Sequence, residues 1–253
     1  MSDTPRLHPF YKLLAFDCLD STNEEAKRRA EQGAAEGTLL WAKRQTAGRG
    51  RRGRQWISPP GNLYCSLVLR PDRTAAEVAQ LGMVAAVATR EILIGVLPPS
   101  ASVLLKWPND VLVNEKKAGG ILLESAAHHI KGISWLVVGI GVNIETHPAG
   151  TSFPSTCLRR EGGHAIGVAS LLEPLCRVFH RWYDIWRIEG FAPVREAWWS
   201  GAWNPGKPID VQLEGRRTTG IFSGLDDQGA LVLSLPDGSQ HRITAADIFA
   251  LPQ

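Results

Sequence analysis

The chain has 253 residues, 44% of them hydrophobic and 21% charged, and a formal net charge of +3; these values are typical of a globular protein with one large domain, or a large and a small one. No two of its four cysteines form a Cys-x-x-Cys pair, so the sequence indicates neither a zinc site nor a disulfide framework. The N-terminus lacks the apolar core of a signal peptide, and charged residues interrupt the apolar runs before bilayer-spanning length, so we expect a cytoplasmic protein.

Hydrophobic periodicity and capping residues predict helices and strands through most of the chain. Ser21 and Glu24 form an S-x-x-E capping box, so a helix is expected over residues 22–33. A long helix is expected at residues 74–96, and strands are expected at residues 38–43, 62–69, 103–107, 110–114, 118–125 and 133–144. The last of these strands is apolar enough to be the centre of a sheet.

The remaining sequence changes character twice. Residues 145–167 are polar and rich in glycine, which predicts a loop, and helices are expected at residues 169–188 and 194–200. Short strands separated by Asp-Gln-Gly and Pro-Asp-Gly turns follow. We therefore predict an α/β domain of residues 1–203 and a small β-barrel domain of residues 204–253.

Positive charge is concentrated in one segment. Residues 37–71 hold seven basic residues and no acidic one, which leaves the rest of the chain net negative. Four of the seven are arginines in the stretch GRGRRGRQW, residues 48–56: Arg49, Arg51, Arg52 and Arg54. Two like charges 6 Å apart repel by roughly 0.7 kcal/mol in water, and the glycines loosen the backbone. This loop is therefore expected to stay mobile until an anion neutralises it.

The same stretch fits the G-x-G-x-x-G pattern of a dinucleotide-binding turn through Gly48, Gly50 and Gly53. That turn requires a helix at its last glycine, because the helix N-terminus holds the pyrophosphate. Here the Pro-Pro-Gly of residues 59–61 and a strand follow instead, so side chains must bind the anion. A solvated basic turn and a nucleic-acid-binding patch are alternative interpretations of the arginines alone.

Five motifs occur in one order and at close spacing: DSTNEEA (20–26), QTAGRGRRGRQW (45–56), KWPNDVLV (106–113), KKAGGILLE (116–124) and VVGIGVNI (137–144). In this combination the chain resembles the biotin protein ligases over nearly its whole length. The resemblance implies an α/β (α+β) fold, with a mixed-sheet core of the biotin/lipoate ligase type and a small SH3-like β-barrel C-terminal domain. It also implies biotin, ATP and Mg²⁺ as ligands. The final acceptor would be a lysine in the biotin carboxyl carrier protein domain of a biotin-dependent carboxylase.

The chemistry of this family explains the cations. Adenylation brings the biotin carboxylate against the α-phosphate of ATP, and two anions about 3.5 Å apart repel by roughly 1 kcal/mol in water and more in a drier site. The resemblance implies that Arg49, Arg51 and Lys117 neutralise these anions and are the catalytic residues. The planar fork of arginine suits bidentate contacts to oxyanions, and lysine supplies a compact charge.

Ligand contacts follow from the same resemblance and from the chemistry of the side chains. The short polar groups at the start of the first expected helix suit the ureido ring of biotin. The expected biotin-binding residues are Ser21, Thr22, Asn23, Gln45, Gly48, Arg49, Gly50, Arg51, Lys117, Gly119 and Gly120. The expected nucleotide-binding residues are Arg51, Arg52, Trp56, Lys106, Asn109, Asp110 and Asn143, and Asp110 is also the expected magnesium ligand.

Several of these positions have a structural alternative. Ser21 and Thr22 also suit helix capping, and Asn109 also suits an Asx-turn. Trp56 would also fasten the loop to the core. The two glycines after Lys117 are equally consistent with a β-bulge.

The sequence departs from the larger members of the family. The ligase motifs begin at Asp20, and nineteen residues are too few for the N-terminal winged-helix domain that makes those members repressors, so no DNA binding is expected. The final residues DIFALPQ lack the arginine that the family often carries in its last strand, which puts a C-terminal arginine contact to the nucleotide in doubt. The oligomeric state stays open between a monomer and a weak homodimer.

Two other functions remain as alternatives. A lipoate or octanoate protein ligase would use a related fold, but the intact GRGRRG loop argues against it. A non-enzymatic nucleic-acid-binding protein would use the arginines directly. It would also need aromatic side chains interleaved with them, and only Trp56 lies near.

Overall fold

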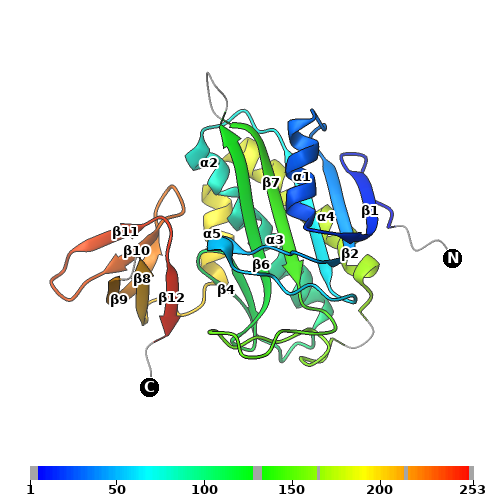
Figure 1. Ribbon diagram of the computed structural model, residues 1–253. Helices are drawn as coiled ribbons and strands as arrows, with labels where there is room; N and C mark the ends of the chain where they lie inside the picture. The colour runs from blue at the N-terminus through cyan, green and yellow to red at the C-terminus, as the bar shows by residue number, and fades with distance from the viewer. Residues whose placement is uncertain (1–4, 128–132, 164–165, 214–215, 251–253) are drawn as a thin grey trace.

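The computed structural model describes residues 5–127, 133–163, 166–213 and 216–250, and contains two β-sheets (Figure 1). The strands of the larger sheet are β1 (Lys12–Leu19), β2 (Thr38–Gln45), β3 (Leu63–Leu69), β4 (Val103–Lys106), β5 (Asp110–Val113), β6 (Lys116–Ala127) and β7 (Ile133–Val142). Their order is β1-β2-β3-β7-β6-β5-β4, so the apolar strand β7 is central, as predicted. β1 and β2 are parallel and the other neighbours are antiparallel, which makes the sheet mixed.

Helices cover both faces of this sheet. They are α1 (Thr22–Glu31), α2 (Ala75–Ala79), α3 (Leu81–Val96), α4 (Val168–Glu189) and α5 (Ala192–Ser200). α1 packs against β2, β3 and β7 on one face, and α3 and α4 pack together on the other (Figure 1). Successive side chains of β7 point to opposite faces of the sheet. Val137 packs with Ala26 and Leu40 under α1, whereas Val138 packs in the main core on the other face.

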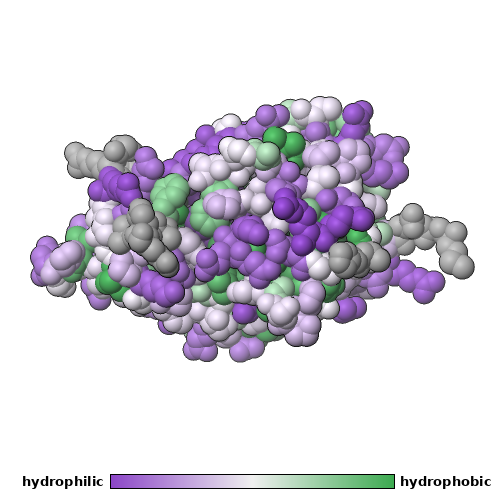
Figure 2. Space-filling model, turned by 90° about the horizontal axis from the view of Figure 1, so that it is seen from below, coloured by the Kyte–Doolittle hydropathy of each residue, from purple (hydrophilic) through white to green (hydrophobic). Residues whose placement is uncertain are grey.

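The apolar stretch predicted as one helix over residues 74–96 forms two helices, α2 and α3, which meet at Gln80. Ala75–Val96 is long and apolar enough to cross a membrane, but 67% of its most apolar window is buried inside the protein. Its Leu81 and Leu93 are fully buried in the main core. This is the burial of a core helix, and the face in Figure 2 shows hydrophobic residues only as small separate areas.

The predicted capping box at the start of α1 is only half formed. The Glu24 N–H donates to Ser21 Oγ at 3.5 Å, as expected, but the Ser21 N–H donates to Asp20 Oδ1 at 2.7 Å. The carboxylate of Glu24 pairs with Lys27 at 3.0 Å and with Arg49. The reciprocal half of the prediction was wrong because Glu24 has charged partners that the local motif does not contain.

A second, antiparallel sheet forms the C-terminal part of the protein. Its strands are β8 (Pro208–Leu213), β9 (Arg216–Leu225), β10 (Leu231–Ser234), β11 (Gln240–Ile243) and β12 (Asp247–Ala250), in the order β11-β10-β9-β8-β12. The predicted fold class, a mixed-sheet α/β core with a small C-terminal β domain, is confirmed.

The turn between β9 and β10 docks on the larger part of the protein. Trp107 Nε1 donates to the Gly229 carbonyl at 3.1 Å, and Gln80 Nε2 donates to the Asp227 carbonyl at 3.3 Å. A Cβ at Gly229 would lie 3.2 Å from the Met83 side chain, so a glycine allows this close contact. The small sheet is thereby fixed beside the core, with β12 at the site described below.

Asn62 fixes the chain where it leaves β7. Its Oδ1 accepts from the backbone N–H groups of Ile144, Glu145 and Thr146 at 2.9 to 3.2 Å, and the side chain is almost fully buried. Asn62→Ala is expected to lower the free energy of unfolding by about 3 kcal/mol, because these donors lose their acceptor. Urea unfolding measures this loss. Asn62→Asp, which keeps an acceptor oxygen, should cost less; equal stability of alanine variant and parent would contradict the assignment.

Candidate active site

A cavity of about 240 Å³ lies on the sheet face that carries α1. Alternate residues of β7 share this face: Trp135 and Val137 lie under α1, and Gly139 and Gly141 follow them along the strand. Past Val137, β7 therefore has no side chain on this face of the sheet. The cavity wall is formed by several elements: the start of α1, residues 45–57, β5, β6, β7, the loop after β7, and β12.

The missing side chains let other residues lie directly on the sheet. A Cβ at Gly139 would lie 2.1 Å from Asn23 Oδ1, and one at Gly141 would lie 2.8 Å from the ring of Trp56. A Cβ at Gly120, which pairs with Gly141 across β6 and β7, would lie 3.2 Å from the same ring. Trp56 thus forms part of the cavity wall and also fastens its loop to the sheet, so both of its predicted roles are compatible.

Polar side chains fill the end of the cavity next to α1. The backbone N–H and the hydroxyl of Thr22 both donate to Gln45 Oε1, at 2.7 and 3.1 Å. The Ser66 hydroxyl lies 2.8 Å from Thr22 Oγ1 and 2.6 Å from Asn23 Oδ1 and shares its one proton between them, and Asn23 Nδ2 donates to Glu124 Oε2 at 3.0 Å. This end of the cavity suits a small group that both donates and accepts hydrogen bonds.

Ser66 and Glu124 were not predicted as part of the site. Ser66 is fully buried in the apolar strand β3, and a small polar residue in such a strand is the signal that could have identified it. Glu124 has no such signal, because β6 also contains Lys116, Lys117 and Ser125. Ser21 was predicted, and it both accepts from the Glu24 N–H and lines the cavity.

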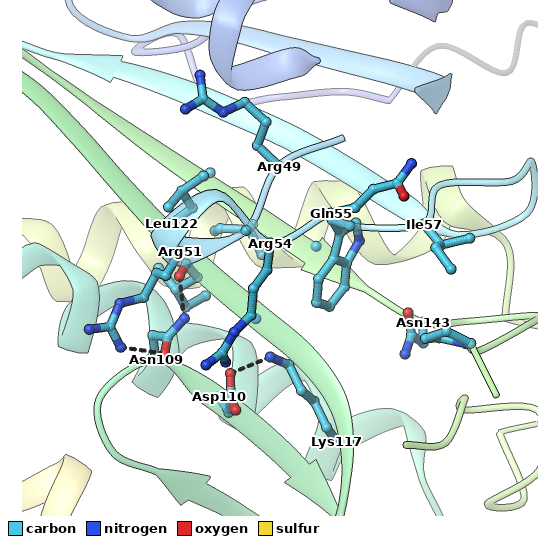
Figure 3. Close-up of a pocket in the computed structure, with 18 of the residues that line it drawn as sticks. Arg49, Arg51, Arg54, Gln55, Ile57, Asn109, Asp110, Lys117, Leu122 and Asn143 are labelled. Carbon is cyan, nitrogen blue, oxygen red and sulfur yellow. Dashed lines mark hydrogen bonds and ion pairs between the residues drawn. The ribbon is translucent and has the colours of Figure 1, made fainter. Parts of the chain in front are cut away.

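The arginine loop, residues 45–57, directs its cations to different partners. Arg49 pairs with Glu24 and lies 3.8 Å from Glu124. Arg51 points away from Arg49, toward Asn109, as Figure 3 shows. The two ends of the cavity therefore each receive an arginine from one loop.

The remaining two arginines of the loop pair with the C-terminal sheet. Arg54 forms an ion pair with Asp247, and Arg52 does so at 3.3 Å. Although burial alone would raise the pKa of Asp247, these neighbouring arginines hold it below its usual value. The acidic partners that the local sequence lacks are thus supplied by distant elements.

Two lysines flank one carboxylate at the other end of the cavity. Lys117 Nζ lies 2.6 Å from Asp110 Oδ1, and Lys106 Nζ lies 3.9 Å from Oδ2 of the same residue. Lys106 is almost fully buried, 4.7 Å from the ring centre of Phe153 and 5.8 Å from that of Phe249, and burial lowers its pKa. The arrangement concentrates positive charge where water is scarce, which suits an anionic ligand.

The two predicted asparagines are held by the backbone. Asn109 Nδ2 donates to the Ile121 carbonyl at 2.9 Å, and Asn109 Oδ1 accepts from Arg51 at 3.0 Å (Figure 3). This cross-link replaces the Asx-turn considered for Asn109. Asn143 Nδ2 donates to the Thr156 carbonyl at 3.1 Å, and the residue lines the cavity.

The last described strand reaches the cavity, which the sequence did not predict. Asp247 and Phe249 of β12 both line it, as residues two apart on one strand face. This strand has the sequence DIFA, so it brings a carboxylate and an aromatic ring, but no arginine, to the cavity.

Most of the predicted site residues line the cavity, with three exceptions: Gly48, Arg52 and Gly119. Gly48 packs behind the loop, where a Cβ would lie 2.4 Å from the Trp56 carbonyl. Gly119 packs against Val111 on the opposite face of the sheet. Within the described parts of the chain, no group of three or more His, Cys, Asp and Glu side chains is placed to hold a metal ion, and the carboxylates that line the cavity are those of Asp110 and Asp247.

Comparison with known proteins identifies this architecture. Residues 55–200 match the Biotin/lipoate A/B protein ligase family, and residues 206–251 match the Biotin protein ligase C terminal domain. The chain belongs to the biotin protein ligase family. It is therefore an enzyme, a ligase. It is 43% identical over 235 residues to a biotin–[acetyl-CoA-carboxylase] ligase of Paracoccus denitrificans. The aligned region covers 91% of this chain and 97% of that protein.

Other ligases are similar in sequence or structure. A bifunctional ligase/repressor of Bacillus subtilis is 35% identical, over 93% of this chain and 73% of the relative. The biotin protein ligase of Aquifex aeolicus, solved in complex with biotin and ATP, superposes with a TM-score of 0.82 at 28% identity, over 96% of this chain and all of that one. Both sheets of the fold therefore occur together in a known ligase.

Proposed function

We propose that this ligase activates biotin with ATP and then attaches it to a carrier protein. In the first step a biotin carboxylate oxygen bonds to the α-phosphorus of ATP, and the bond to the leaving pyrophosphate breaks. In the second step a lysine amine of the carrier attacks the carbonyl carbon of biotinyl-5′-AMP. AMP leaves, the amine loses its proton, and an amide remains.

The observation that carries this proposal is the division of the cavity into two chemically different ends. Thr22, Asn23 and Gln45 provide hydrogen-bonding groups at one end, and Arg51 and Lys117 provide cations at the other. A ureido ring with a carboxylate at the end of an alkyl chain matches this order. Between the ends, the ring of Trp56, which lies on Gly120 and Gly141, gives the alkyl chain an apolar wall.

The cationic end performs the chemistry in this proposal. Lys117 and Arg51 neutralise the carboxylate and the α-phosphate so that they approach one another, and they stabilise the charge that develops at phosphorus. Asn109 holds the guanidinium of Arg51 in place. Lys106, with few water contacts, adds charge toward the phosphates. Arg49 closes the loop over the biotin end.

Mg²⁺ would bind together with the nucleotide, and most of its ligands would be phosphate and water oxygens rather than protein side chains. Asp110 is the one carboxylate proposed to hold it, and Mg²⁺ usually combines one or two carboxylates with water and phosphate oxygens. The described residues fit this mode because Asp110 lies between Lys106 and Lys117, where phosphates are expected. The ion supplies additional positive charge to the phosphates when bound.

We also propose which part of the chain forms each domain and what each domain does. Residues 1–203 form the catalytic domain that binds biotin and ATP, and residues 204–253 form a small SH3-like domain that completes the cavity through Asp247 and Phe249. The acceptor is a lysine of a biotin carboxyl carrier protein domain.

Calorimetry tests this function. Biotin is titrated alone and after incubation with ATP and Mg²⁺, and lipoate and octanoate are titrated in parallel. We expect micromolar or tighter binding of biotin, and mass spectrometry should detect biotinyl-5′-AMP and pyrophosphate. Tight binding of lipoate or octanoate with none of biotin would assign the protein to the other branch of the family.

The glycine-lined surface gives a further prediction. Gly141→Ala is expected to raise the KM for biotin by at least about tenfold, because the added methyl group would lie 2.8 Å from the Trp56 ring and force it into the cavity. Steady-state adenylation kinetics measure the change. Gly95→Ala, where nothing lies within 4 Å of the added carbon, is the matched control. Equal KM values for both variants would show that Trp56 moves away freely.

A further inference from the structure

Glu124 stands outside the residues that the proposed chemistry uses, yet at the biotin end of the cavity it contacts both α1 and the arginine loop. Its Oε1 lies 3.2 Å from Lys27 Nζ and 3.8 Å from Arg49, and its Oε2 accepts from Asn23 Nδ2 at 3.0 Å. Only 19% of the side chain is exposed. One oxygen therefore faces cations and the other faces a single amide.

The side chain of Asn23 has little freedom except to exchange its nitrogen and oxygen. It rests on Gly139, where a Cβ would lie 2.1 Å from Oδ1, so its plane lies against β7. On one side it meets Ser66 Oγ at 2.6 Å, and on the other it meets Glu124. A serine hydroxyl both donates and accepts, so Ser66 tolerates either orientation of the amide. A carboxylate only accepts, so Glu124 tolerates one.

The orientation of this amide controls the hydroxyl groups beside it. With Oδ1 toward Ser66, the single Ser66 proton is shared between Asn23 and Thr22 Oγ1, at 2.6 and 2.8 Å. With the amide reversed, Nδ2 would donate to Ser66, whose proton would go wholly to Thr22. Thr22 would then lose part of its capacity to accept a hydrogen bond from an N–H group of a ligand.

We propose that Glu124 is a positioning residue for the biotin ureido ring: its carboxylate fixes the Asn23 amide, and through Ser66 it keeps Thr22 available as an acceptor. This inference rests on the proposed function of the cavity. Lys27 and Arg49 hold the carboxylate by its other oxygen, so the same residue links the arginine loop to the polar end of the cavity.

Two substitutions of Glu124 distinguish the effect of its hydrogen bond with Asn23 from the effect of its negative charge. Glu124→Met removes the acceptor and keeps a similar length, and it should raise the Kd for biotin at least about tenfold, with a change below threefold in the adenylation rate at saturating biotin. Glu124→Gln removes the charge but keeps an acceptor oxygen, and its Kd should stay within about threefold of the parent. Calorimetry and single-turnover pyrophosphate release give the two quantities, and thermal unfolding verifies that each variant is folded.

A specificity measurement distinguishes positioning from a structural role. In 2-iminobiotin an imino nitrogen replaces the ureido oxygen, which changes the hydrogen-bonding pattern of the ring. The preference of the parent for biotin over 2-iminobiotin should narrow at least about threefold in Glu124→Met and persist in Glu124→Gln. Glu24→Gln removes a carboxylate that also contacts Lys27 and Arg49 but has no bond to Asn23, and should keep the preference.

Equal loss of biotin affinity in the methionine and glutamine variants would overturn the proposal, because charge alone would then explain the effect. Unchanged affinity in Glu124→Met would overturn it as well. The proposed function has a separate outcome: a parent protein that binds no biotin fails that test whatever the variants do.

Discussion

Lys117→Ala is expected to slow biotinyl-5′-AMP formation by at least about 100-fold, the usual cost of removing one preorganised electrostatic donor. The Lys117 ammonium lies 2.6 Å from Asp110 and is partly exposed to the cavity, so it remains available to an incoming oxyanion. Its charge matters most where negative charge grows in the transition state. Biotin affinity should therefore fall far less than the adenylation rate.

Pyrophosphate release in a single turnover measures this rate, and calorimetry measures the affinity. Lys116→Ala is the matched control, because Lys116 precedes Lys117 on β6 but lies 3.6 Å from Glu161, outside the cavity. An adenylation rate within about threefold of the parent in Lys117→Ala would remove this residue from the mechanism.

The second large effect is expected from Arg51→Gly. The guanidinium of Arg51 is half-buried at the cavity wall, where it donates to Asn109, and burial lowers its pKa without neutralising it at physiological pH. Without this contact the loop should close less tightly over the mixed anhydride. Reactive adenylate should then escape and acylate bystander lysines, since its selectivity depends on being held until the carrier docks.

Incubation of the variant with biotin, ATP and albumin, followed by detection of biotin on the albumin, measures this escape. We expect labelling at least about tenfold above the parent. Arg44→Ala, an exposed arginine of β2 just before the loop, is the control for loss of charge. Trypsin should cleave the parent loop more slowly when biotin and ATP are present; equal cleavage and equal labelling would mean that the loop does not act as a lid.

The sequence predicted those parts of the fold that depend on local pattern. The apolar content of β7 placed it at the centre of the sheet, and the Ser21 cap predicted the start of α1. β1 was not predicted, because KLLAFDCL lacks a regular alternation of apolar and polar residues and lies at a sheet edge. Gln80, where the expected long helix divides, hydrogen-bonds Trp186, a contact between distant residues that no local pattern contains.

The candidate site was predictable to the extent that its residues lie in short motifs. The arginine loop and Lys117 were expected together, and the structure brings both to one cavity. Asp247 was not expected, because nothing in its own strand indicates that it pairs with Arg54 almost two hundred residues away. Glu124 was missed for the same reason: its partners come from α1 and the loop, and only folding places them beside it.

The part played by β12 has a consequence for the order in which the site is assembled. Asp247 and Phe249 are the last of the cavity-lining residues to leave the ribosome. Until they arrive, the nascent chain holds Arg52 and Arg54 without their carboxylate partner and Lys106 without one of its aromatic neighbours. Translation must therefore run almost to the end of the described chain before the wall of the cavity is complete.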